Sequence, residues 1–354
     1  GLIVNANGPN GPRVAYIMSR FPRLTETFIL YEILALERRG LRVEIYPLLR
    51  ERRTRVHPDG ASTFAKAIDL MSDEEGELVM HAEARELLPR VHYGGLLGWA
   101  ILRDVGSALV RRPIAFLATL ATVVRCSLAI FPRAVHIGAE MRRAGITHVH
   151  AHFANHPTTA AFVIRALSGI DYSFTGHGAD LQVDQHMLRE KIGSAAFARA
   201  ISADGRQFME RLAPEGAAAR VVVVPCGIDT ASFEGPRQAR GPGSPLRLLC
   251  VATMYEVKGH RYLFEAMSLL TERGIDAVCW LAGDGPDRAA LEADVARRGM
   301  YDRIRFLGRQ TRDQVIKLMH EADLLVVPSV PTASGRREGL PVVIMEAMAA
   351  RLPV

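Results

Sequence analysis

Short apolar runs separated by glycine, proline and polar loops recur along most of this chain. Nine of them have the length of buried strands: 14–18, 43–49, 171–175, 198–202, 221–224, 246–251, 277–281, 303–307 and 324–327. Segments of helical length lie between several of these runs, notably 28–39, 260–270 and 342–349. Strands that alternate with helices predict an α/β fold built on parallel sheets.

A Gly- and Pro-rich stretch at 234–245 interrupts this alternation and is typical of an interdomain linker. The chain has 354 residues, enough for two domains, so we expect one at 1–233 and a second at 246–354. Within the first, the region from about 60 to 145 has no clear strands and predicts a helical insertion. The last residues begin a further apolar run at Leu352, so we expect the second domain to be truncated and the natural protein to be longer.

The insertion raises the question of a membrane contact. Its longest apolar stretch, 113–130, contains Arg125 and is shorter than the roughly 20 uninterrupted apolar residues of a spanning helix. Two interpretations stay open: a helical hairpin packed on the first domain, which we favour, and an interfacial amphipathic helix at a membrane.

The charge and the cysteines narrow the class of protein. The formal net charge of +6 comes almost entirely from arginine, and it fits anionic lipids, phosphorylated substrates or simply an arginine-rich composition. No basic-aromatic RNA motif and no zinc-finger spacing occur in the sequence, so we expect no nucleic-acid partner. The four cysteines are far apart and form no Cys-x-x-Cys pair, which indicates a reducing, cytoplasmic location.

The stretch 337–347 contains the most informative chemistry. A turn-rich loop follows the run at 324–327, and Glu338 and Gly339 then precede an apolar helix that carries Glu346. Gly339 lets the backbone approach a ligand, and the free N–H groups after Leu340 favour an anion. About 10 Å of helical rise between the carboxylates would let one hold a sugar and the other a ribose. Two solvated surface glutamates are the alternative.

Histidines and a polar loop mark the first domain. His148, His150 and His152 share one face of a predicted strand and could hold zinc, but no carboxylate or cysteine joins them in sequence. We therefore expect no metal. His177 lies between two glycines at a strand end, which favours a ligand contact over a structural role.

The loop at 19–28 should lie at the carboxyl end of the first strand. There Thr25, Glu26 and Thr27 could hydrogen-bond a sugar, or Thr25 could instead cap the following helix.

Two motifs resemble a known family. Glu-Gly-Leu-Pro at 338–341, followed by Glu346, is similar to the signature of retaining nucleotide-sugar glycosyltransferases of family 4. Phe-Pro-x-Leu-Thr-Glu-Thr-Phe at 21–28 resembles the opening of bacterial exopolysaccharide members, including those of colanic-acid type. The resemblance implies the GT-B fold, in which two Rossmann-like domains face a cleft.

The resemblance also implies roles for individual residues. His177 and Glu338 would position the reacting sugar, Lys258 would grip the diphosphate, and Glu346 would hold the ribose. His152 would lie nearest the ligand at the mouth of the cleft. Other donor contacts would come from loops and from the helix start: Gly283, Gly285, Phe306, Gly308, Gly339 and Leu340. The chain departs from the family at Ala252-Thr253, where the family has Gly-Arg, which leaves impaired diphosphate binding open.

These expectations define a function. We expect a retaining transfer of a hexose from a nucleotide-diphosphate sugar to a saccharide acceptor, expected to be lipid-linked, at the inner face of the cell membrane. The sequence contains no Asp-x-Asp, so we expect no metal and no other cofactor. Three alternatives remain: a catalytically impaired homologue that binds a nucleotide sugar or a partner, an epimerase, and a phosphorylase.

Overall fold

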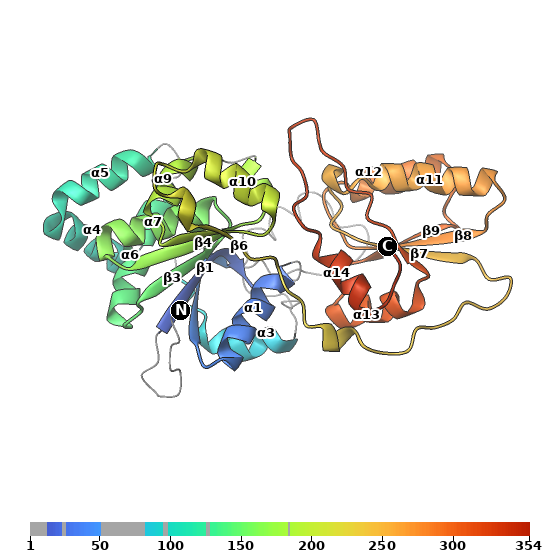
Figure 1. Ribbon diagram of the computed structural model, residues 1–354, viewed down its shortest axis with the longest axis horizontal. Helices are drawn as coiled ribbons and strands as arrows, with labels where there is room; N and C mark the ends of the chain where they lie inside the picture. Colours follow the sequence, from blue (N-terminus) through green and yellow to red (C-terminus); the bar gives the residue numbers. More distant parts are fainter. Residues whose placement is uncertain (1–12, 23–25, 51–81, 95–97, 125–127, 183–184) are drawn as a thin grey trace. The chain divides into compact units, whose positions relative to one another are not determined.

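The computed structural model describes residues 13–22, 26–50, 82–94, 98–124, 128–182 and 185–354. The chain divides into two compact units, 1–224 and 225–354, and each is built on its own parallel sheet (Figure 1). The predicted α/β class is therefore confirmed. Because parallel neighbours need a crossover connection, helices follow most strands and cover the faces of both sheets.

The first unit has a six-stranded sheet in the order β2-β1-β3-β4-β5-β6. Its strands are β1 (Arg13–Phe21), β2 (Arg42–Arg50), β3 (His148–His152), β4 (Asp171–Gly176), β5 (Phe197–Ala200) and β6 (Val221–Val223). Side chains alternate along β1, so Ala15 and Ile17 join one hydrophobic cluster while Tyr16 and Met18 join the other. The sheet is thus buried on both faces.

Helices flank this sheet on both sides (Figure 1). They are α1 (Thr27–Arg38), α3 (Ala82–Leu87), α4 (Trp99–Arg111), α5 (Pro113–Val123), α6 (Phe131–Arg143), α7 (His156–Ser168), α8 (Ala179–Gln182), α9 (Leu188–Ser194) and α10 (Ala203–Leu212). Helices α1 and α3 pack on one face, and α5 to α7 pack on the other. The described residues between 82 and 143 are mainly helical, and there α4 packs on α6 and α5 on α7.

The second unit has a four-stranded sheet in the order β10-β7-β8-β9. Its strands are β7 (Leu246–Val251), β8 (Ala277–Ala282), β9 (Ile304–Gly308) and β10 (Leu324–Leu325), and its helices are α11 (His260–Glu272), α12 (Arg288–Arg297), α13 (Arg312–Glu321) and α14 (Val342–Ala349). Helices α11 and α12 cover one face, and α13 and α14 cover the other. The run at 352–354 forms no strand, although the Leu325 amide donates to the Pro353 carbonyl at 2.8 Å.

The boundary between the units differs from the sequence prediction. It falls after Val224, whereas the pattern placed residues up to 233 in the first domain and 234–245 in a linker. Phe233 is 1% exposed and packs with Leu249 and Leu325 of the second unit. The Gln238 amide also donates to the His320 carbonyl at 2.8 Å. Apolar burial therefore fixes this Gly- and Pro-rich segment against the second unit.

None of the described helices has both the length and the apolar character needed to cross a membrane.

Candidate active site

The histidines of the first unit gather at the carboxyl edge of its sheet. His152 ends β3 and His177 follows β4, the neighbouring parallel strand. His152 is fully buried, and its Nδ1 lies 3.1 Å from Nε2 of His177, with the two rings stacked at 5.4 Å. The structure therefore brings together the two histidines that the sequence singled out separately.

Hydroxyl groups form hydrogen bonds with ring nitrogens of the other two histidines of β3. Ser173 Oγ on β4 lies 2.7 Å from His148 Nε2 and 2.8 Å from His150 Nδ1. Thr175 Oγ1 lies 2.9 Å from His150 Nε2. Burial is the main reason that the pKa of His150 lies well below its usual value, so this histidine is neutral at pH 7.

A carboxylate on α1, which sequence reasoning missed, anchors the cluster. Glu32 Oε1 accepts a hydrogen bond from the Tyr16 hydroxyl at 2.7 Å and lies 3.5 Å from Nε2 of His152. Its other oxygen pairs with the Arg199 guanidinium. Burial disfavours the charged carboxylate, but the neighbouring histidines and Arg199 outweigh it and lower the pKa of Glu32. Glu32 therefore stays ionised beside the histidines.

His177 itself is half-buried and packs against two phenyl rings. The Phe28 ring centre is 4.7 Å from the imidazole, and the Phe153 ring centre is 4.6 Å from it. Burial, with a further contribution from His152 and Arg199, lowers the pKa of His177 well below its usual value. A neutral imidazole can either donate to or accept from a sugar hydroxyl.

Two buried charges, also missed, fix the loops around these histidines. Asp180 accepts from the backbone N–H of Ala154 at 2.7 Å and of His177 at 2.8 Å. Lys191 is fully buried, and its ammonium donates to the carbonyls of Ala154 and His186. Asp180 therefore ties the loop after β3 to the loop that carries His177.

The predicted acceptor-side residues lie at the start of α1. Glu26 occupies the N-cap position and Thr27 is the first helical residue, and both are half-buried. The next residue, Phe28, packs against His177, so α1 begins beside the histidine pair. Thr25, expected to bind sugar or to cap this helix, lies outside the described residues.

Among the described residues, one group of metal-ligating side chains converges: Glu32, His150 and His152, with ligand atoms within 4.8 Å of one another. Both nitrogens of His150 already face hydroxyls, and both oxygens of Glu32 already face Tyr16 and Arg199. A cation would have to displace these partners and lie near the Arg199 guanidinium. The donor set fits a hydrogen-bonded network better than a metal centre.

The second unit presents paired charges at the carboxyl edge of its own sheet. The Lys258 ammonium, in the loop after β7, forms an ion pair with Glu338, in the loop after β10. The Ser329 hydroxyl donates to the other oxygen of Glu338. The two residues predicted to bind the donor thus contact each other in this structure.

Glycines let the loops of this edge pack closely. Gly283 has φ +149, and a Cβ there would lie 1.9 Å from the carbonyl oxygen of Ala252. A Cβ at Gly285 would lie 2.4 Å from the carbonyl oxygen of Met254. No side chain fits at either position, so the loops after β7 and β8 form one continuous backbone surface. Thr253, the residue at the family's arginine position, lies half-buried between these two contacts.

The remaining predicted donor contacts lie nearby or on α14. Phe306 lies within β9 and Gly308 ends it, and the Gly308 carbonyl accepts from the Gly283 amide at 2.8 Å. Pro341 is the N-cap of α14, and Gly339 and Leu340 precede it. Burial raises the pKa of Glu346, which lies within the helix, while Arg312 partly offsets the effect.

Comparisons with known proteins show what the chain is similar to. Residues 245–354 match the family model described as "Glycosyl transferases group 1". The chain is 25% identical over 348 residues to WcaL of Salmonella typhimurium, which is named as a colanic acid biosynthesis glycosyltransferase. It is 26% identical over 351 residues to AmsK, the amylovoran biosynthesis glycosyltransferase of Erwinia amylovora. Each alignment covers 97% of this chain and 81% of the relative.

Solved glycosyltransferase structures have the same fold as this chain. Anabaena HepE in complex with UDP-glucose superposes with a TM-score of 0.65 at 15% identity, over 97% of this chain and 79% of that one. The outer-core galactosyltransferase WaaB gives a TM-score of 0.58 at 16% identity, over 96% and 79% of the two chains. The chain therefore has the GT-B fold of these glycosyltransferases, and its residues 245–354 match the group 1 glycosyltransferase family.

Proposed function

We propose that this protein transfers a hexose from a nucleotide-diphosphate sugar to a saccharide acceptor, with retention at the anomeric carbon. The observation that carries the proposal is the Lys258–Glu338 pair at the carboxyl edge of the second sheet, within the segment that matches the glycosyltransferase family. The names of WcaL and AmsK support a place in exopolysaccharide or cell-surface polysaccharide biosynthesis.

The second unit would bind the donor. A diphosphate carries more negative charge than Glu338, so it can take over the Lys258 ammonium and leave the carboxylate for the sugar hydroxyls. The start of α14, after Gly339 and Leu340, adds free backbone N–H groups for the leaving phosphate. Glu346 would accept hydrogen bonds from the ribose. The loops at Gly283, Gly285 and Gly308 carry no side chains at these positions, so the nucleotide could lie close to their backbone.

The first unit would contribute the sugar and acceptor contacts. Neutral His177, held against His152, can hydrogen-bond the transferred sugar without adding charge. Glu26 and Thr27 would contact the acceptor. In the expected front-face reaction the acceptor oxygen bonds to the anomeric carbon as the phosphate oxygen leaves, and that phosphate oxygen takes the acceptor's proton. A lipid-linked acceptor would bring the protein to the cytoplasmic face of the membrane.

Thr253 favours a second candidate, a homologue that binds a nucleotide sugar but turns it over poorly or not at all. Loss of the family's arginine removes one cation from the diphosphate site. Binding and chemistry therefore need separate tests.

Calorimetry with UDP, ADP, GDP and their glucose conjugates tests the binding step. We expect one nucleoside diphosphate to bind, and we expect its affinity to fall with rising salt because the ligand is anionic. Absence of binding by all three nucleotides would contradict both candidates.

A further inference from the structure

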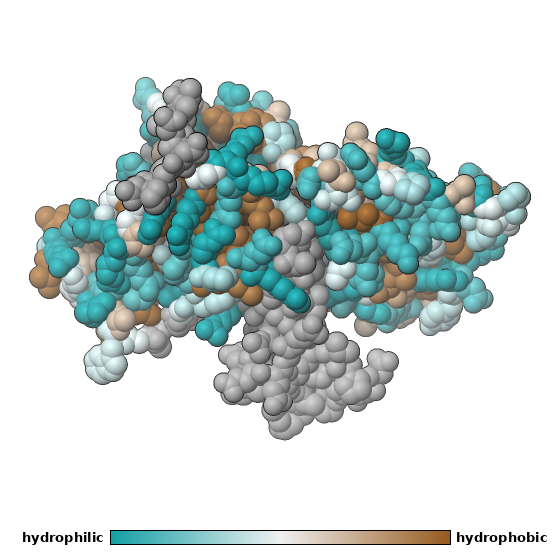
Figure 2. Space-filling view, turned by 90° about the horizontal axis from the view of Figure 1, so that it is seen from below, coloured by the Kyte–Doolittle hydropathy of each residue, from teal (hydrophilic) through white to brown (hydrophobic). Residues whose placement is uncertain are grey.

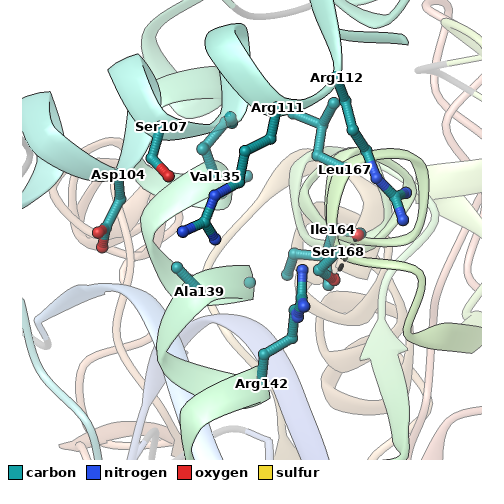
Figure 3. A pocket seen from close by; sticks show the side chains of 13 residues that line it. Asp104, Ser107, Arg111, Arg112, Val135, Ala139, Arg142, Ile164, Leu167 and Ser168 are labelled. Atoms are coloured by element: carbon teal, nitrogen blue, oxygen red, sulfur yellow. Dashed lines mark hydrogen bonds between the residues drawn. The ribbon is translucent and has the colours of Figure 1, made fainter.

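A second candidate site lies in the first unit, away from the carboxyl edge of its sheet. Helices α4, α6 and α7 enclose a cavity of about 280 Å³. Figure 3 shows the guanidinium groups of Arg111, from α4, and Arg142, from α6, pointing into it. Arg112 lies at its side, and small residues such as Ala139 and Ser168 form the wall between them.

Positive charge in this cavity is not neutralised. Among the described residues, the side chains of Arg111 and Arg142 have no hydrogen bond or ion pair, and the Arg112 side chain reaches only the Ala166 carbonyl at 3.5 Å. Asp104, the acidic residue of the lining, is already engaged elsewhere.

Both oxygens of the Asp104 carboxylate have partners. Its Oδ1 accepts from Arg103 at 2.9 Å, and its Oδ2 lies 2.7 Å from His136 Nδ1 and 3.5 Å from Arg143. Burial disfavours the charged form, but these hydrogen bonds prevail and lower the pKa of Asp104. The cavity therefore offers two unpaired, forked donors to an anion, the geometry that suits a phosphate.

Exposed apolar side chains lie on α4 and on the neighbouring helix α5. Trp99, Val110 and Ile114 on α4 and α5 are 88%, 81% and 84% exposed, and Leu117 is 58% exposed. Figure 2 shows hydrophobic side chains at the surface at the left end of the view, where Figure 1 places α4 and α5. The opposite side of α5 is buried through Phe116 and Val123, so these exposed residues are not needed for the core.

We propose that this surface binds an anionic phospholipid of a membrane. Charge complementarity selects the headgroup phosphate for the cavity at Arg111 and Arg142, and the apolar residues on α4 and α5 would enter the boundary between headgroups and acyl chains. A soluble phosphate compound would use the arginines but would leave Trp99, Val110, Ile114 and Leu117 in water. The inference rests on the cavity and this patch, independently of the glycosyl-transfer chemistry.

Vesicle binding with an intrinsic reporter tests the proposal. The chain has two tryptophans, so in a Trp280→Phe background Trp99 alone reports on its surroundings. We expect co-sedimentation with vesicles of phosphatidylcholine containing phosphatidylglycerol, with a blue shift of Trp99 fluorescence. Pure phosphatidylcholine vesicles should bind weakly and give little shift.

Matched variants separate the site from overall charge. Arg111→Gln/Arg142→Gln should lower the affinity for anionic vesicles on the order of tenfold or more. Arg38→Gln/Arg39→Gln removes the same charge at the exposed end of α1, on the opposite face of the sheet, and should have a much smaller effect. Val110→Ser/Ile114→Ser should weaken binding and reduce the Trp99 shift while all arginines remain.

Three outcomes would overturn the proposal. Equal losses in the two arginine double variants would show attraction to overall charge alone. Binding of glycerol phosphate in calorimetry without any binding to vesicles would assign the cavity to a soluble phosphate. Absence of both kinds of binding would show that the cavity holds no phosphate.

Discussion

The carboxyl edges of the two sheets use ionisable groups in opposite ways. In the first unit, His150 and His177 are kept neutral by burial, and Glu32 is held ionised by fixed partners. In the second, Lys258 and Glu338 are half-exposed on loops and pair with each other. The first edge is a preorganised polar network, whereas the second must exchange partners when an anionic ligand binds. Substitutions at the first edge should therefore affect stability or the placement of the sugar, and substitutions at the second should affect the handling of the anionic donor.

Lys258→Met should have the largest effect. Loss of the cation removes charge stabilisation of the leaving diphosphate, and we expect turnover to fall on the order of 10²–10³-fold. Lys317→Met is the matched control, because Lys317 is an exposed lysine of the same unit, on α13. Steady-state release of nucleoside diphosphate measures both variants. Similar activity in the two would show that Lys258 does not contact the diphosphate.

His177→Asn should lower turnover by about 10²-fold, since a misplaced sugar is costly even when the donor still binds. Nucleotide affinity should be unchanged, because this residue contacts the sugar rather than the nucleotide. His148→Asn, at the other end of the β3 histidine row, serves as the control. A parallel loss of nucleotide affinity in His177→Asn would count against its proposed role.

Glu32→Gln should destabilise the first unit by about 1.5–3 kcal/mol at pH 7, because Arg199 loses its charged partner. The pKa of Glu32 is lowered from 4.5, so its stabilisation is complete above that pH and is lost as the pH falls below it. The stability difference between wild type and variant should therefore shrink on acidification. Urea unfolding at pH 7 and pH 4 measures it, and a difference that grows at low pH would contradict the assignment.

Glu346→Gln should weaken the binding of the free nucleotide and of the nucleotide sugar alike, by on the order of 1–3 kcal/mol. Burial raises the pKa of Glu346 above 4.5, so wild-type affinity should fall as the pH drops toward the raised pKa. The variant should lack this dependence. Calorimetry between roughly pH 5 and pH 8, a range in which most proteins stay folded, would compare the pH dependence of affinity in wild type and variant. Unchanged affinity in Glu346→Gln would remove the ribose assignment.

Chelation should have the smallest effect. The sequence lacks Asp-x-Asp, and the donor atoms of Glu32 and His150 already have partners, so turnover in excess chelator should equal turnover with magnesium or manganese. Strict dependence on either ion would show that a metal takes part in the reaction.

Sequence patterns predicted the α/β class of the fold and the placement of residues that directly follow a strand. Lys258, Gly283 and Glu338 follow predicted strands, and parallel strands bring their carboxyl ends to one edge, so their placement could be foreseen. Glu32 could not, because it lies in mid-helix and meets Arg199 across 167 positions of sequence. The unit boundary was misplaced because composition alone does not show that Phe233 is buried in the second core.

Turnover of nucleotide sugars by the intact chain tests the central claim most directly. Incubation with UDP-, ADP- and GDP-hexoses should release nucleoside diphosphate and free sugar slowly without acceptor, and faster when a saccharide acceptor is added. A donor that binds but stays unchanged would indicate the impaired homologue. Epimerised donor without acceptor, or a strict requirement for free phosphate, would contradict glycosyl transfer in favour of an epimerase or a phosphorylase.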